Sequence, residues 1–402
     1  MEQQTLEQIL DLLHMPPGPR LPAMEDLLAF CSRYEKVYVC GAGRNSVYLH
    51  KILKSCGVDA AGFAVSQPER GEQDGTPVVA LGRVPETPGA GLVLGLGDIY
   101  YHEILPILRG KGFVDYYPLA ECDKQEIAKK FEPKPREKLT FEITVADHCN
   151  LSCLSCDHFS QLADPWTVPV ETFAEDAARM GELLGHKSGA IQLIGGEPLL
   201  HPRLPDLGRI LRAEFPDSVL LLVTNGLLLA KGSAGEVWAA LREYSISAVV
   251  TSYPIRFDYG LLEAKAKAEN VPIYISGEIR TPGNHRKRQH RQTILLAGNA
   301  PKHGFTGCGY LNACNVLRDG KWYICPKAAH IETFNKHFSR DIARVAADYV
   351  DIYKAGSWRE LAEYSSNRIP LCDYCDVPNW QANYKEWQPS GKTIEEYVGK
   401  GS

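Results

Sequence analysis

The sequence predicts an α/β protein with two parallel-sheet regions followed by a cysteine-rich C-terminal region. Two observations support this prediction. Apolar strand patterns alternate with helical patterns from residue 36 to residue 276, which is typical of parallel sheets. Eight of the 12 cysteines are grouped between residues 149 and 375, and grouped cysteines in a chain without a secretory signal point to metal binding. A chain of 402 residues has room for about two to four domains.

Composition excludes several classes of protein. The chain is 44% hydrophobic with a net charge of −5, which argues against disorder and against nucleic-acid binding through bulk positive charge. No apolar run reaches the ~18 residues of a membrane span. The N-terminus is acidic and lacks a basic, apolar signal. We therefore expect a cytoplasmic protein with no membrane or nucleic-acid partner, whose thiols stay reduced.

Residues 1–125 predict a small parallel sheet. Helical spacing over 6–13 stops at a proline cluster, and a second helix is predicted over 24–34. An apolar strand over 36–40 runs into Gly41-Ala42-Gly43 and a helix over 45–56. The remaining predictions are a helix over 101–109 and strands over 60–65, 78–81, 92–96 and 113–117.

A charged, proline-broken segment over 126–136 is the predicted boundary to a second strand–helix series. Its strands are predicted over 139–145, 190–194, 219–224, 247–251 and 272–276, and its helices over 170–184, 204–215, 234–243 and 259–268. This series predicts a barrel or a partial barrel, with functional loops at the carboxyl ends of the strands. Beyond it lie a turn-rich region with a short strand over 321–324 and a polar tail, 381–402, expected to be peripheral.

The first cysteine group, Cys149, Cys153 and Cys156, directly follows the first strand of this series. Thiolates suit iron–sulfur clusters and zinc. Three thiolates can hold three irons of a cubane and leave the fourth open for catalysis. The alternative is a zinc site with His148 or His158 as the fourth ligand.

Two further motifs follow in order, each at a strand end: Gly195-Gly196-Glu197-Pro198 and Thr224-Asn225-Gly226. Together with the cysteine spacing, they resemble the radical S-adenosylmethionine superfamily over about residues 137–280. This resemblance implies a partial (β/α) barrel. It also implies a [4Fe-4S] cluster on the three cysteines, with S-adenosylmethionine on the open iron. Reduction would yield a 5′-deoxyadenosyl radical that abstracts a hydrogen atom from the substrate.

The resemblance also implies roles for single residues. Gly195, Gly196, Glu197 and Pro198 would meet the methionine amino group, with the glycines allowing close backbone approach. The ribose or the carboxylate would lie near Thr224, Asn225 and Ser252, and Arg280 is a candidate for the methionine carboxylate. Ser155 stands where the family has a bulky residue. Its backbone would still contact the adenine, while Phe159 or His158 is a candidate stacking partner.

A second group comprises Cys308, Cys325, Cys372 and Cys375. Its spacing resembles the twitch extension, a shortened SPASM extension, which implies a second [4Fe-4S] cluster on these four residues. A structural zinc ribbon is the alternative. Cys314 is then spare: it could replace Cys308 as a ligand, pack as a thiol, or donate a hydrogen atom to the substrate, which would make it catalytic.

The N-terminal Gly41-Ala42-Gly43 is part of a dinucleotide fingerprint, but Ser46 replaces its third glycine and no acidic residue ends the second strand. NAD is therefore not expected. The region resembles Rossmann-like modules that accompany nucleotide-sugar enzymes, which suggests either a nucleotide or sugar phosphate at the helix N-terminus or a docking role without a ligand.

A basic run covers residues 285–291. It reads either as a solvated linker or as a clamp for a phosphorylated or acidic substrate, because arginine matches phosphate geometry. The predicted domains are a Rossmann-like domain over 1–125, the partial barrel over 137–290 and the auxiliary-cluster region over 300–380.

The sequence thus predicts an oxidoreductase or epimerase that acts on a carbohydrate, aminocyclitol or nucleotide-sugar. The expected partners are a small-molecule substrate, possibly phosphorylated or nucleotide-linked, and a reductase, flavodoxin or ferredoxin as electron donor. One alternative is a peptide-modifying radical enzyme, although such enzymes often carry a winged-helix domain where this chain predicts α/β. A non-catalytic zinc or iron–sulfur protein is another.

Overall fold

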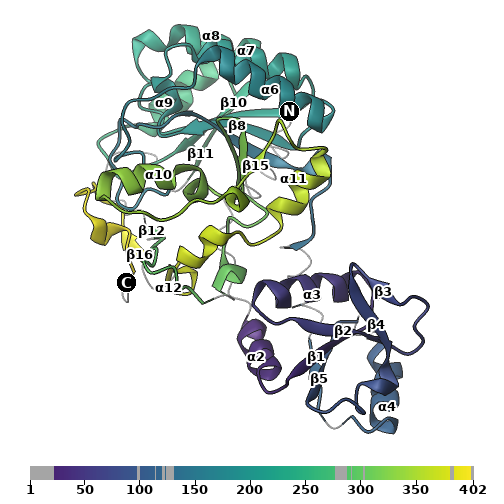
Figure 1. The fold of residues 1–402 in the computed structure, drawn as a ribbon. Helices are drawn as coiled ribbons and strands as arrows, with labels where there is room; N and C mark the ends of the chain where they lie inside the picture. Colours follow the sequence, from purple (N-terminus) through teal and green to yellow (C-terminus); the bar gives the residue numbers. More distant parts are fainter. Residues whose placement is uncertain are drawn as a thin grey trace.

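A computed structural model describes residues 22–96, 100–113, 115–119, 123, 131–276, 288–290, 292–301, 304–380 and 384–399. These residues form a six-stranded sheet near the N-terminus, an eight-stranded sheet and a two-stranded ribbon. Figure 1 shows the small sheet set apart from the large one. The chain is therefore an α/β protein built mainly on parallel sheets, as the sequence predicts.

The small sheet has the strand order β3-β4-β2-β1-β5-β6 and is parallel except for β3. Its strands are β1 (Lys36–Cys40), β2 (Ala60–Val65), β3 (Glu72–Gln73), β4 (Thr76–Ala80), β5 (Ala90–Leu94) and β6 (Tyr117–Pro118). Three helices accompany them: α2 (Pro22–Cys31), α3 (Arg44–Ser55) and α4 (Tyr101–Gly110).

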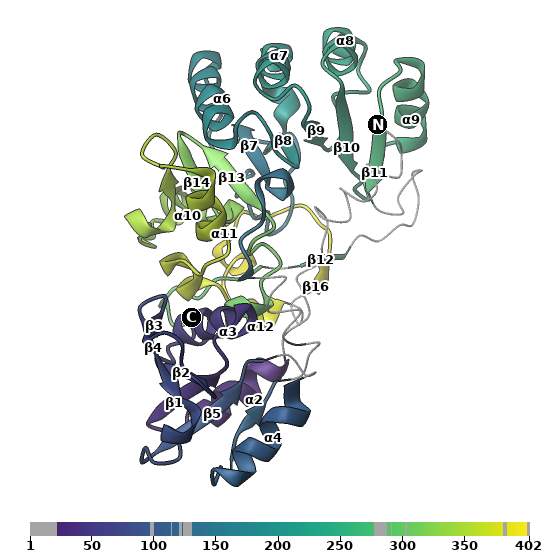
Figure 2. The same ribbon diagram turned by 90° about the vertical axis from the view of Figure 1, so that its right-hand side faces the viewer.

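The large sheet begins with five parallel strands in the order β11-β10-β9-β8-β7. They are β7 (Thr140–Ala146), β8 (Ala190–Gly195), β9 (Val219–Thr224), β10 (Ile246–Thr251) and β11 (Ile273–Ser276). The helices between them are α6 (Val170–Leu184), α7 (Leu204–Glu214), α8 (Gly235–Glu243) and α9 (Tyr259–Ala268). Figure 2 shows these four helices side by side along one face of the sheet.

Distant C-terminal residues continue the same sheet beyond β7. Strand β13 (Asn315–Arg318) pairs in parallel with β7, followed by antiparallel β14 (Lys321–Tyr323) and β15 (Val350–Asp351). Among the described strands, β11 and β15 are the two edges of an open sheet, in keeping with a partial barrel. The remaining elements are α10 (Pro326–Phe338), α11 (Trp358–Ser365), α12 (Val377–Trp380) and the ribbon of β12 (Arg288–His290) with β16 (Tyr384–Glu386).

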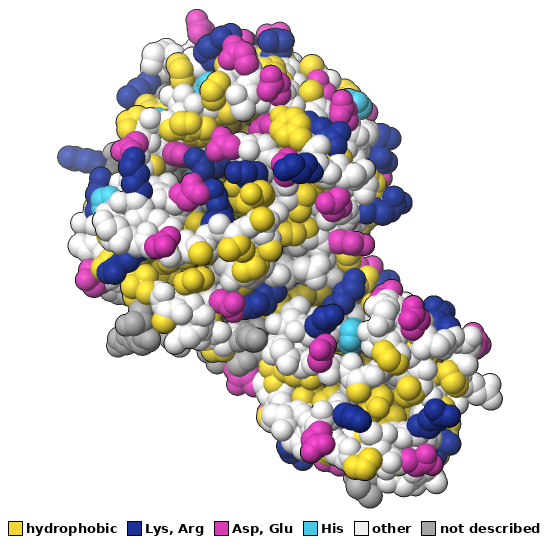
Figure 3. Space-filling view, in the orientation of Figure 1, with side chains coloured by type: hydrophobic (Ala, Val, Ile, Leu, Met, Phe, Trp, Pro, Cys, Tyr) yellow, Lys and Arg dark blue, Asp and Glu magenta, His cyan; other side chains and the backbone are white. Residues whose placement is uncertain are grey.

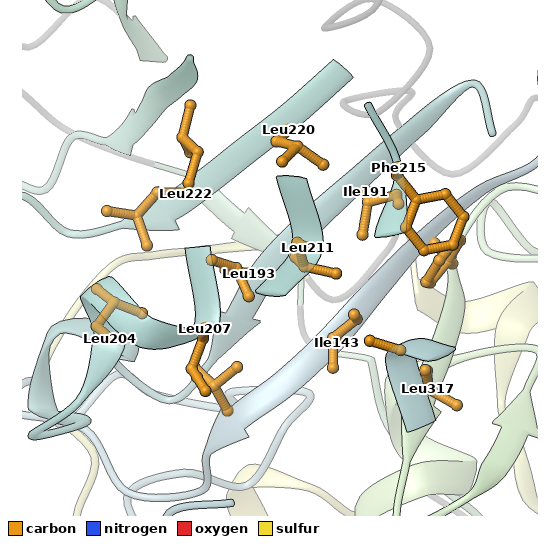
Figure 4. Packing of buried hydrophobic residues seen from close by; sticks show 14 of the residues in the cluster. Ile143, Ile191, Leu193, Leu204, Leu207, Leu211, Phe215, Leu220, Leu222 and Leu317 are labelled. Carbon is orange, nitrogen blue, oxygen red and sulfur yellow. The ribbon is translucent and has the colours of Figure 1, made fainter. Parts of the chain in front are cut away.

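The alternation of side chains along β7 decides what lies on each face of the large sheet. Phe141, Ile143 and Val145 belong to the main apolar core, which the helices cover. Figure 4 shows how Leu207 and Leu211 of α7 pack over the strands in this core. The intervening residues of β7 therefore point to the opposite, inner face.

Most predicted elements agree with the structure. The strands over 36–40, 60–65 and 219–224 and the helices over 170–184 and 259–268 have the predicted bounds. The strand over 113–117 was wrong, because only Tyr117–Pro118 pairs, at the edge beyond β5. The helix over 6–13, Arg280 and most of the segments 126–136 and 285–291 lie outside the described residues. The domain division remains a prediction.

Charges of both signs are interspersed over the face shown in Figure 3. In the described part of the chain, every helix is too short or too polar to cross a membrane.

The core predicts a stability effect. Leu211 is fully buried, whereas Leu261 on α9 is 70% exposed. We expect Leu211→Ala to lower the free energy of unfolding by about 2–5 kcal/mol, and Leu261→Ala, the matched control, to change it by less than about 0.5 kcal/mol. Anaerobic denaturant titration measures both; equal effects would contradict the assigned packing.

Candidate functional site

A cavity opens on the inner face at the carboxyl ends of the large sheet. It holds about 690 Å³ of empty space, which includes space open to solvent. Seven of the predicted site residues line it: Cys149, Cys153, Cys156, Gly195, Gly196, Thr224 and Asn225. Three segments far apart in the sequence thus meet around one space.

The three cysteines of this cavity are a fitting donor set for a cluster. Burial raises the pKa of both Cys149 and Cys156 to about 12, and the Cys153 thiol nearby raises each further. All three thiols line one cavity, and a metal bound there would displace their protons. The sulfur of Cys149 also accepts a hydrogen bond from the backbone N–H of Leu151 at 3.3 Å, a contact of the kind that tunes iron–sulfur centres.

The two glycines bring the end of β8 against the start of the cysteine loop. Gly195 has φ +150°, and a Cβ built on it would lie 2.1 Å from the carbonyl oxygen of Ala146. A Cβ on Gly196 would lie 2.2 Å from that of His148. The backbone N–H of Gly196 donates to Ala146 at 2.7 Å. Any side chain at either position would push β8 and the cysteine loop apart.

Glu197 joins the second motif to the third. Its side chain is fully buried and accepts hydrogen bonds from the Thr224 hydroxyl at 2.6 Å and from the backbone N–H groups of Asn225 (2.9 Å) and Leu199 (3.1 Å). Burial raises its pKa to about 7, although these donors lower it. Glu197 does not line the cavity itself. It acts on the site indirectly, by holding Thr224 and Asn225, which do line it, in position.

Asn225 carries this connection on to the cysteine loop. Its side-chain N–H₂ group donates to Asn150 at 2.6 Å and lies 3.9 Å from the sulfur of Cys149. The chain of contacts therefore runs from Glu197 through Asn225 to the first cysteine.

Other predicted residues lie beside the cavity or outside the described chain. Ser155 is buried, has φ +53°, and donates its hydroxyl to the carbonyl of Glu396. Ser252 is buried between two lining residues. Pro198 opens a short 3₁₀ turn next to Glu197. Of the two suggested stacking residues, His158 lines the cavity, whereas Phe159 packs in the core against Phe334 and Tyr397.

The tail corrects one expectation, because it is not peripheral. Residues 388–390 run along the cysteine loop: the N–H of Leu154 donates to Gln388, and that of Ser390 donates to Ser152. The ring of Tyr397 is 3% exposed, and its centroid lies 5.4 Å from that of Phe159. The periodicity of a short polar tail gives no sign of this docking, since backbone groups make many of the contacts.

The second cysteine group also converges. Burial raises the pKa of Cys325, Cys372 and Cys375, and neighbouring thiols of the group, Cys308 among them, contribute in the same direction. All eleven cysteines that the structure describes are free thiols. Cys325 caps the N-terminus of α10. Three segments of the chain thus bring these four thiols into one neighbourhood.

Cys314 is the remaining cysteine of the C-terminal region. It directly precedes β13, and its pKa is raised well above the usual range by burial and by the charges of Glu142 and Asp157. Cys308 and Cys325 contribute less. At neutral pH this side chain is therefore a neutral S–H group.

A polar network that the sequence did not reveal fills the space beside Cys314. His158 contacts Asp157 at 3.0 Å, and Asp157 accepts the hydroxyl of Tyr310. The side chain of Gln292 joins Tyr310 to Lys327. Its amide N–H₂ group donates to the hydroxyl of Tyr310, and its amide oxygen accepts a hydrogen bond from the ammonium of Lys327 at 2.7 Å. Burial raises the pKa of Asp157, but His158, Lys327 and Tyr310 outweigh it and hold the pKa well below its usual range.

Glu142 of β7 is the other missed residue. It is 5% exposed, and burial raises its pKa to about 7. The available signal was a lone carboxylate in an otherwise apolar and threonine-containing strand, 140–146.

The small sheet has its own cavity at the carboxyl ends of β1 and β2, beside Cys40, Gly41 and Ser66. Gly41 has φ +94°, and Ser46 donates its hydroxyl to the carbonyl of Cys40. The nucleotide or sugar-phosphate ligand suggested for this region remains a prediction.

Comparison with known proteins adds a sequence likeness. GTP 3′,8-cyclase 1 of Mycobacterium tuberculosis is 31% identical over 122 residues, 29% of this chain and 33% of that protein. GTP 3′,8-cyclase of Chlorobaculum tepidum is 33% identical over 109 residues, 26% of this chain and 31% of that protein. The chain spans about a third of the length of these curated relatives, and it matches no protein-family profile.

Solved structures give only distant likenesses. BtrN in complex with AdoMet and 2-DOIA overlaps 65% of this chain and 97% of its own, with 17% identity and a TM-score of 0.36. Streptococcus suis SuiB bound to S-adenosylmethionine overlaps 56% of this chain and 71% of its own, with 11% identity and a TM-score of 0.26.

Three ordered motifs around one cavity and the likeness to the curated relatives together support a radical S-adenosylmethionine superfamily enzyme. The same findings support iron–sulfur and S-adenosylmethionine binding.

Glu197 predicts a first test of this site. In Glu197→Gln, the amide N–H₂ would face donors that the carboxylate now accepts from, which leaves buried groups unpaired at a cost of about 1–3 kcal/mol. We expect weaker S-adenosylmethionine binding in anaerobic calorimetry. Glu236→Gln, at an exposed position of α8, is the matched control, and equal affinity of the two variants would rule out the assigned role.

The contact between the C-terminal tail and the cysteine loop provides a second test of this site. Tyr397→Ala removes the ring that supports Phe159 in the cysteine loop, so we expect faster loss of iron to a chelator after reconstitution. Tyr100→Ala, at a half-exposed position of the small sheet, is the control. Iron retention equal to wild type in both variants would count against the support.

Proposed function

We propose that this protein is a radical S-adenosylmethionine oxidoreductase or epimerase acting on a small polyhydroxylated substrate. The substrate classes we favour are a carbohydrate, an aminocyclitol or a nucleotide-sugar. The proposal rests on two cysteine groups and on a hydrogen-bonded set of buried polar residues beside the first of them.

The residues of the first cavity fit the group that the superfamily requires. Cys149, Cys153 and Cys156 would hold the [4Fe-4S] cluster, while Gly195, Gly196, Thr224 and Asn225 would contact S-adenosylmethionine. When bound, the two together supply a 5′-deoxyadenosyl radical that removes a hydrogen atom from a substrate carbon. The chain's own task is to position the substrate and exclude water.

The single observation that favours a small polar substrate is the composition of the space next to the cavity. Asp157, His158, Tyr310 and Lys327 form one connected hydrogen-bonded array with Gln292. Such an array matches a molecule with several hydroxyl or amino groups. A peptide substrate would need an open groove, so peptide modification is the second candidate. The α/β fold at the N-terminus, where peptide-modifying enzymes often carry a winged-helix domain, also favours a small-molecule substrate over a peptide.

The second cysteine group would hold an auxiliary cluster on Cys308, Cys325, Cys372 and Cys375, a site suited to accepting the electron that a substrate radical loses when it is oxidised. Cys314, a neutral thiol beside Glu142 and Asp157, instead suits the return of a hydrogen atom in an epimerisation. A reductase, flavodoxin or ferredoxin would reduce the first cluster.

Anaerobic reconstitution tests the metal sites. We expect about eight irons per chain, since each cluster carries four, and 5′-deoxyadenosine after reduction with S-adenosylmethionine. Replacing Cys372 and Cys375 by serine should remove about half of the iron. Zinc in place of iron, with no cleavage of the cofactor, would indicate the non-catalytic alternative.

Cys314→Ala separates the two reaction types. If the thiol returns hydrogen to the substrate, the variant should lose product and solvent-deuterium incorporation in D₂O while it still binds S-adenosylmethionine. A variant that turns over at the wild-type rate without deuterium exchange would instead indicate oxidation.

A further inference from the structure

We propose that Glu142 and His158 form a hydroxyl-binding pair for the substrate, next to the thiol of Cys314. This inference rests on the proposed function and goes further, because it assigns the residues that hold the reacting part of a polyol. It starts from two buried polar atoms that lack partners in the structure.

Glu142 lies on the inner face of β7, the face opposite the apolar core. Its two neighbours on that face are both engaged: the hydroxyl of Thr140 donates to the carbonyl of Ala313, and that of Thr144 pairs with His330 at 3.2 Å. Between them, the Oε1 atom of Glu142 is buried without a hydrogen-bond partner. A buried, unpaired carboxylate oxygen costs free energy in the absence of a ligand.

The register of the sheet directs Glu142 toward the cavity. Glu142 pairs with Gln192 of β8, and the next residue of β8 on the same face, Ile194, lines the cavity. Val223 of β9 and Thr251 of β10 line it as well. The inner face that carries Glu142 is therefore the wall that continues into the cavity.

His158 approaches the same space from the cysteine loop and itself lines the cavity. Its Nδ1 atom is taken by Asp157 at 3.0 Å, whereas its Nε2 atom is buried without a partner. His330, which pairs with Thr144 on the inner face of β7 at 3.2 Å, has its ring centroid 5.2 Å from that of His158. This contact brings His158 over the same face of β7 that carries Glu142.

The chemistry of these two atoms selects the ligand. A carboxylate only accepts hydrogen bonds, and an imidazole nitrogen accepts or donates according to its protonation. A hydroxyl group can donate a hydrogen bond to Glu142 Oε1 and accept one from His158 Nε2, so one hydroxyl of the substrate would satisfy both atoms. Two hydroxyls on neighbouring carbons would do the same, one for each atom. Cys314, which directly precedes β13, the strand next to β7, then lies beside the carbon that bears the bound hydroxyl.

The test measures binding rather than turnover. The probes are scyllo-inosamine and UDP-glucose, each paired with an analogue that lacks one hydroxyl, titrated anaerobically into reconstituted protein with S-adenosylmethionine. We expect Glu142→Gln to weaken binding of the preferred probe about ten- to hundredfold, as loss of a hydrogen bond to a charged group does. The analogue lacking the contacted hydroxyl should bind wild type and variant alike.

Controls separate the possible failures. Glu142→Asp keeps the charge and withdraws it by one methylene, so it should weaken the same probe, whereas Glu236→Gln should not. Iron content and S-adenosylmethionine affinity of the Glu142 variants should equal wild type, and loss of either would assign Glu142 a structural role and overturn the pair. Equal probe affinity in Glu142→Gln and wild type overturns it too. If no probe binds wild type, the proposed substrate class fails first.

Discussion

The buried carboxylate of Glu197 is the contact on which the arrangement of the site depends. It accepts hydrogen bonds from the ends of two different segments, Leu199 after β8 and Thr224 with Asn225 after β9. Because a buried carboxylate is costly unless donors surround it, its position is determined by all three donors at once. Asn225 is thereby held where it reaches Asn150 and Cys149.

Close backbone approach complements this contact. The end of β8 can lie against Ala146 and His148 only because Gly195 and Gly196 lack side chains. The glycines allow the approach and the glutamate fixes its direction. The ordered motifs of the sequence therefore also have a structural role: they hold the strand ends and the cysteine loop in position without any contribution from a cofactor.

The C-terminal third completes the site from a distance. Strand β13 joins the sheet beside β7 and brings Cys314 next to Glu142, while residues 388–397 cover the cysteine loop. One segment links both cysteine groups: Ile294 pairs with Cys375 on one side and with Val398 on the other. The polar array with its unpaired atoms lies between these parts, which is the kind of buried polarity that proteins retain for function.

The sequence determined the fold class, most of the regular elements and the three motifs around the cavity, because helical and strand periodicity and short motifs are local properties. It even gave the bounds of the helices over 170–184 and 259–268. The tertiary structure alone revealed the strand 315–318 beside β7, the docking of the tail, and the approach of Glu142 to His158. The first two features arise from pairing between residues more than a hundred positions apart and from backbone hydrogen bonds. The third arises from how the cysteine loop folds back over the inner face of β7, and none of the three leaves a periodic signal in the amino-acid sequence.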